Sequence, residues 1–66
     1  MSRDEATLLD ITRSAQLIIE FVRGMGKDAF MNDLKTQSAV EHQLMVLGEA
    51  VKRLSFDLRD AHPEVP

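Results

Sequence analysis

Two stripes of apolar residues, each advancing by alternating steps of three and four, run through most of this 66-residue chain. The first stripe is Leu8, Ile11, Ala15, Ile18, Val22 and Met25, and the second is Val40, Leu44, Leu47, Val51, Leu54 and Leu58. This spacing places each stripe along one side of an α-helix, as a seam narrow enough to meet another helix. The sequence therefore predicts an all-α fold built on a long helical hairpin.

Capping signals at both ends of the first stripe define the first helix. Ser2 and Glu5 have the spacing of a capping box, so the helix is expected over residues 3–23. Gly24 and Gly26 are expected to end it, because glycine readily takes the left-handed conformation that a helix terminus often needs.

A short connecting helix and a second long helix are predicted to follow. Residues 27–33 fit a short helical turn. The second long helix is expected to begin between Asp33 and Ser38, which are both good N-caps, and to continue to about Leu54. The pattern leaves residues 55–61 open.

A hairpin of this size has little to pack against. A chain this short buries only about 60% of the surface that its unfolded form exposes. Its lack of cysteine excludes disulfides and thiolate metal sites, so we expect a homo-oligomer, a dimer that completes a four-helix-type bundle. The core or oligomer seam is expected to contain Leu8, Ile11, Ile18, Val22, Val40, Leu44, Leu47, Val51 and Leu54. These seams fit parallel and antiparallel pairing equally well.

Charge and hydropathy narrow the classes of partner. The net charge of −3 argues against a nonspecific phosphate-binding surface. The three aromatic residues are all Phe, which argues against a platform for stacking single-stranded bases. No apolar run approaches the roughly 20 residues that span a bilayer, and the acidic N-terminus lacks a signal-peptide core. We expect a cytoplasmic protein without membrane association.

The titratable residues do not form a catalytic or metal-binding pattern. His42 and Glu49 share roughly one face of the second helix, but a lone histidine with a few carboxylates is more typical of a solvated face than of a metal site. Glu49 and Arg53 are expected to form a surface i, i+4 ion pair. No catalytic residue, metal or cofactor is predicted from the pattern.

Gly48 needs an explanation, because it lies inside the second predicted helix. Glycine there costs about 1 kcal/mol relative to alanine. One interpretation is the close approach of another helix, and the other is room for a substrate or for a partner's backbone.

The second helix also carries a resemblance to a known family. Residues 38–54 resemble the second long helix of HepT-like proteins of the HEPN superfamily, the toxins of HepT–MntA toxin–antitoxin pairs. The Leu-Gly-Glu-Ala step at 47–50 is its most specific part. The other similar segments, in order, are residues 10–22, Phe30 with Asp33, and residues 62–66.

The resemblance implies a dimeric all-α bundle and a metal-independent endoribonuclease. In the family, the active site is an Arg followed four to six residues later by a His, on a helix after the segment matched here. Arg59 and His62 have only two residues between them, and Arg53 lies too far from His62, so no catalytic residue is carried over. Glu49 is carried over only as a polar residue facing the active-site cleft.

Three functions are therefore considered for residues 1–66. The first is the N-terminal part of one HEPN-like domain of a HepT-like ribonuclease toxin, inactive here because the motif is absent. The second is a non-catalytic helical dimerisation or partner-binding module. The third is a helical-hairpin oligomer unrelated to toxins. The partners that the resemblance implies are a second copy, an MntA-like nucleotidyltransferase antitoxin and, for the intact family member only, RNA.

Overall fold

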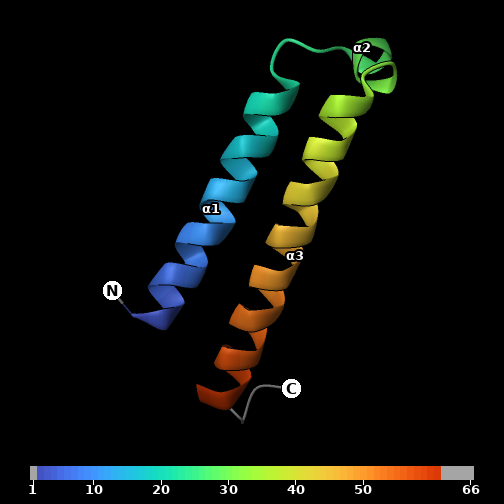
Figure 1. Cartoon of the computed structure of the whole chain (residues 1–66). Helices are drawn as coiled ribbons and strands as arrows, with labels where there is room; N and C mark the ends of the chain where they lie inside the picture. Colours follow the sequence, from blue (N-terminus) through green and yellow to red (C-terminus); the bar gives the residue numbers. More distant parts are fainter. Residues whose placement is uncertain (1, 62–66) are drawn as a thin grey trace.

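Two long helices lie side by side and antiparallel, with a short helix across one end (Figure 1). The structure is a computed structural model, and it describes residues 2–61 except for the side chains of residues 57–59 and 61. This arrangement confirms the predicted all-α hairpin with a short connecting helix. The elements are α1 (Arg3–Val22), α2 (Lys27–Met31) and α3 (Leu34–Ala61).

Local capping interactions fix both ends of α1. Ser2 is the N-cap, and its Oγ accepts a hydrogen bond from the Glu5 amide at 3.1 Å, as the capping box predicts. Beyond the last turn, Gly24 has a φ of +75°, a left-handed conformation that glycine adopts without steric cost. The Met25 amide then donates to the Val22 carbonyl oxygen at 2.9 Å, which closes the end of the helix.

An aspartate begins α3. Oδ1 of Asp33 accepts a hydrogen bond from the Thr36 amide at 3.0 Å, and Oδ2 accepts one from the Thr36 hydroxyl at 2.8 Å. Both hydrogen bonds favour the ionised carboxylate and so hold the pKa of Asp33 below its ordinary value. The bond from the Thr36 amide has the larger effect, and the bond from the Thr36 hydroxyl the smaller one. The helix begins at Leu34, inside the predicted interval, and continues to Ala61, so residues 55–61 are helical.

A glutamine side chain ties α2 to the first turn of α3. Nε2 of Gln37 donates to the carbonyl oxygens of Phe30 and Met31, at 2.9 and 3.0 Å. Carbonyl groups in the last turn of a helix lack an intrahelical partner, and the Gln37 side chain supplies one to each of these two, although the Phe30 oxygen also accepts from the Asp33 amide at 3.2 Å. The Asn32 side chain donates from Nδ2 to the Asp28 carbonyl oxygen at 2.8 Å. The connector therefore has a defined position against α3.

The most deeply buried residues of the hairpin are small. The buried residues in the described part of the chain are Thr7, Ser14 and Ala50, with 2%, 3% and 1% of their surface exposed. Short side chains at a contact allow two helix axes to approach closely. Thr7 and Ser14 directly precede Leu8 and Ala15 of the predicted stripe. The most buried line of α1 therefore follows one edge of that stripe rather than its centre.

The hairpin is one layer of helices. The molecule measures 46 × 26 × 15 Å, and an α-helix with its side chains is about 10–12 Å across. Its shortest dimension therefore accommodates a single helix, and within residues 2–61 no second layer covers either broad face. Neither long helix, over the part described, has the length and apolarity that a membrane span requires.

Candidate functional site

Exposed apolar side chains gather on the side of α3 that faces away from α1. Helical spacing at about 100° per residue places a set of exposed residues around one line along this helix. We call this surface the outer face of α3. It comprises Leu34, Glu41, Leu44, Met45, Gly48, Val51, Lys52, Ser55 and Phe56. Its five large apolar residues are all exposed, from 45% at Val51 to 75% at Leu34.

The outer face of α3 is hollowed near its C-terminal end. Val51, Lys52, Ser55 and Phe56 line a shallow hollow of about 290 Å³. Two of these residues are apolar and exposed, and the other two bring an ammonium group and a hydroxyl. A contiguous exposed apolar surface rimmed by polar groups marks an interaction site more often than a scattered one does.

Gly48 lies at the centre of the outer face of α3. A Cβ built on it would meet no other described residue within 4 Å, apart from the adjoining backbone of α3. The contact with α1 therefore does not require a glycine at this position, although glycine inside a helix costs about 1 kcal/mol relative to alanine. One of the two predicted explanations was the close approach of another helix, and no described part of this hairpin approaches Gly48 in that way.

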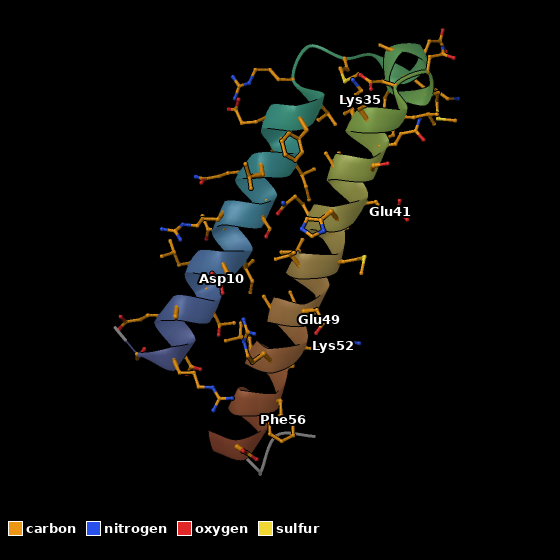
Figure 2. All side chains as sticks on the ribbon, in the orientation of Figure 1. Asp10, Lys35, Glu41, Glu49, Lys52 and Phe56 are labelled. Carbon is orange, nitrogen blue, oxygen red and sulfur yellow. The ribbon has the colours of Figure 1, made fainter. Side chains whose placement is uncertain are left out.

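Charged side chains also project from this surface. Figure 2 shows Glu41, Glu49 and Lys52 on the side of α3 turned away from α1. Glu49, predicted to face an active-site cleft, is exposed, and its carboxylate makes no hydrogen bond or ion pair with a described residue. Its role in a cleft stays a prediction.

Arg53 turns toward α1, so the predicted surface pair between Glu49 and Arg53 is wrong. Arg53 donates from Nε to the Thr7 hydroxyl and from Nη2 to Oδ2 of Asp10, both at 3.4 Å. The Thr7 hydroxyl itself donates to the Arg3 carbonyl oxygen at 3.0 Å. This polar cluster joins the two long helices, and its arginine is already paired with a carboxylate.

Sequence reasoning missed the cluster because its members are 43 to 46 positions apart. Finding it requires the register between the two helices, which no local pattern contains. Once the antiparallel register is known, Arg53 lies opposite the first turns of α1, where Thr7 and Asp10 are its nearest polar partners. An i, i+4 spacing alone favoured the wrong partner.

The nine predicted seam residues divide into two groups. Six are half-buried between the helices: Ile11, Ile18, Val22, Val40, Leu47 and Leu54. Leu8, Leu44 and Val51 are exposed, with 50%, 53% and 45% of their surface accessible. The side chain of Leu58, from the second stripe, lies outside the described residues. The hairpin thus covers part of the seam and leaves part of it open.

The described residues do not assemble a catalytic centre. They include no group of three or more His, Cys, Asp or Glu side chains that could hold a metal ion. His42 is exposed on α3, eleven positions from Arg53, which is about 16 Å along the helix axis. The side chain of Arg59 and the whole of His62 lie outside the described residues.

A second hollow, of about 580 Å³, runs along α1. Its lining residues are Arg13, Gln16, Leu17, Ile19, Glu20 and Arg23. One helix supplies all of them, and the Glu20 carboxylate lies 2.6 Å from Nη2 of Arg23. With its walls on a single helix, this hollow does not enclose a ligand.

Comparison with known proteins identifies the family. Residues 11–66 match the family described as "Ribonuclease HepT-like". The chain belongs to the HepT-like ribonuclease family. This confirms the resemblance found in the sequence of α3 and its neighbours. No solved structure matches the chain.

Curated relatives of this HepT-like chain carry names of ribonucleases. It is 46% identical to a "Putative RNase" of Methanocaldococcus jannaschii over 61 residues, 92% of this chain and 50% of that protein. It is 42% identical to a "Probable ribonuclease HepT" of Thermococcus cleftensis over 59 residues, 89% of this chain and 54% of that protein. The chain thus spans about half the length of the curated relatives that it matches.

Proposed function

We propose that this chain supplies the first helical hairpin of a HepT-like, metal-independent endoribonuclease, and that these 66 residues do not cleave RNA by themselves. The observation that carries the proposal is the family match over residues 11–66. The proteins named as ribonucleases are about twice as long as the segment matched here. The remaining residues of such a protein would bring the Arg and His of the family motif.

The chemistry of RNA cleavage supports this division. Without a metal, cleavage needs a group near neutral pKa to move a proton and a cation to stabilise charge on the phosphate. His42 and Arg53 are about 16 Å apart along one helix, too far to serve a single phosphate. Arg53 is also engaged with Asp10. A catalytic pair must therefore come from other residues or from a second chain.

A second candidate function is association without catalysis. The observation that favours it is the outer face of α3, where five large apolar side chains are exposed around Gly48. Its partner would be a second copy of this chain, an intact HepT-like subunit, or an MntA-like nucleotidyltransferase. In this role the chain forms mixed oligomers and leaves RNA intact.

The two functions are separated by an RNA cleavage assay on two samples. One is the purified 66-residue chain, and the other is the native gene product from the source cell, whose intact mass is measured first. Both are incubated with labelled RNA in the presence of a metal chelator. The proposal expects a native mass well above 7.4 kDa. It also expects cleavage by the native product alone.

Two other results contradict the proposal. Cleavage by the short chain, lost in a His62→Ala variant but kept in a His42→Ala variant, would overturn its predicted inactivity. A native product of 7.4 kDa that leaves RNA intact would favour the association role.

A further inference from the structure

We propose that the outer face of α3 is self-complementary, and that two copies of this chain associate through antiparallel α3 helices that cross at Gly48. The inference rests on the association of copies proposed above and specifies its geometry, which the apolar stripes leave open. Three features of the outer face of α3 carry it: the open glycine, the apolar residues beside it, and the order of charges along the helix.

The glycine marks the crossing point. Apart from the adjoining backbone of α3, no atom of the described residues lies within 4 Å of the position that a Gly48 Cβ would take. At a crossing of two helices, residues without a side chain permit the closest approach of the backbones. If two copies meet around a two-fold axis, the residue on the axis meets itself, and a glycine is well suited to that position.

The apolar residues on one flank then match each other. Leu44 lies about 6 Å before Gly48 along the helix axis, and Val51 about 4.5 Å after it. Both lie to the same side of Gly48 around the helix. In the antiparallel pair, Leu44 of each copy therefore faces Val51 of the other. Both side chains are about half exposed in the single chain, so this contact buries apolar surface at two equivalent places.

The other flank brings a side chain to the hollow. Met45 is 67% exposed and lies about 4.5 Å before Gly48. In the second copy, the same level on this flank is occupied by Lys52, which lines the hollow of about 290 Å³ together with Val51, Ser55 and Phe56. Methionine is flexible enough to fill a shallow, irregular space.

The charges select the antiparallel direction. Glu41 lies about 10.5 Å before Gly48 and Lys52 about 6 Å after it, on the same flank. Antiparallel pairing places the Glu41 carboxylate near the Lys52 ammonium of the second copy, twice per dimer. Parallel pairing in register would place Glu41 beside Glu41 and Lys52 beside Lys52, and like charges opposed across an interface disfavour it.

Disulfide cross-linking tests the direction, because the chain contains no cysteine of its own. A bond forms only where the two Cα atoms lie within about 7 Å. We expect no cross-link in Leu44→Cys alone or in Val51→Cys alone, but a cross-linked heterodimer when the two variants are mixed. Gly48→Cys is expected to cross-link with itself. Gln16→Cys, on exposed α1, is the control and is expected to stay monomeric on a non-reducing gel.

The alternative outcomes are distinct. Self-cross-linking by Leu44→Cys and by Val51→Cys, without a heterodimer, would mean parallel pairing, so the geometry would be wrong while association stands. The proposal would be overturned if no variant formed a cross-link and the wild-type chain were monomeric by sedimentation equilibrium. A second copy would then not bind to the outer face of α3. Neither outcome bears on the ribonuclease proposal, which the cleavage assay decides.

Charge reversal tests the Glu41–Lys52 contact independently. We expect Glu41→Lys and Lys52→Glu each to raise the dimer dissociation constant about tenfold, and the double variant to restore it. Lys35→Glu makes the same charge change on another side of α3 and is expected to leave the constant unchanged. A double variant as weak as the single ones would overturn the pairing.

Discussion

The two sides of α3 differ in how far their apolar residues are covered. The side that meets α1 holds the buried Ala50 and the half-buried Val40, Leu47 and Leu54. The outer face exposes large apolar residues, such as Met45 and Phe56, at 67% and 64%. A helix normally turns its largest apolar residues toward its own core. The difference indicates that α1 covers one side of α3 only, while the large apolar residues of the outer face are left for another molecule or segment.

The largest expected effect comes from breaking the contact between α1 and α3, which we call the inner contact. Leu47 is half-buried between the helices, and Leu47→Asp removes its apolar contacts and brings a charge into the seam. We expect a loss of at least about 2 kcal/mol, enough to unfold a hairpin of marginal stability. Far-UV circular dichroism at fixed concentration measures the loss of helix.

Met45→Asp is the matched control for this change, because Met45 lies two positions away and is 67% exposed. It is expected to retain more helix than Leu47→Asp at the same concentration, since it leaves the α1–α3 contact intact. Retained helicity and unchanged oligomer size in Leu47→Asp would show that the inner contact does not hold the hairpin together.

Gly48→Ala sharpens the comparison, because it is expected to change the stability of the helix and the strength of association in opposite directions. In the single hairpin the added methyl group meets nothing, so helix stability should rise by about 1 kcal/mol. In the proposed antiparallel dimer the same methyl group lies at the crossing, so association should weaken. We expect a higher thermal midpoint at low concentration together with a larger dissociation constant by sedimentation equilibrium.

Gly24→Ala provides the contrast, because Gly24 has a φ of +75° and alanine is strained there. That variant should lose stability at every concentration. If Gly48→Ala instead strengthens association as well as the helix, the glycine does not lie at the contact between copies.

The sequence predicted the helices well because their boundaries depend on local signals. The Ser2 cap, the left-handed Gly24 and the Asp33 cap each act within four residues; the first two are found where they were predicted, and Asp33 is one of the two predicted caps. The pattern left residues 55–61 open, and α3 continues through them to Ala61. The family was also accessible from sequence, through the Leu-Gly-Glu-Ala step of α3.

The rotation of each helix was harder to predict, for a physical reason. Apolar periodicity identifies a wide face, but it does not tell which edge of that face meets the neighbouring helix. Thr7 and Ser14 are the buried residues of α1, while Leu8, one position after Thr7, stays exposed. The predicted partner of Arg53, Glu49, was wrong for a related reason. The contact with Asp10 spans 43 positions and so depends on the register of the hairpin.

The smallest expected effect concerns the polar edge of the inner contact. The Arg53–Asp10 pair has an N–O distance of 3.4 Å, with the two side chains 45% and 50% exposed. Such pairs contribute about 0.2–1 kcal/mol and weaken with salt. A double-mutant cycle of Asp10→Asn and Arg53→Gln, read from thermal unfolding, should give a coupling energy in this range that falls at high salt.

The Glu20–Arg23 pair is the control for this cycle. At 2.6 Å it is shorter than the Arg53–Asp10 pair, but its members are three residues apart within α1, so it does not join the two helices. Its removal should lower the helicity of α1 without changing how α1 and α3 pack. If the Arg53–Asp10 cycle gives no coupling and the hairpin keeps its register, then the contact of Thr7, Ser14 and Ala50 sets that register without help from the ion pair. Coupling that persists at high salt would instead point to the buried Thr7 hydroxyl, which accepts from Nε of Arg53, as the stronger part of the cluster.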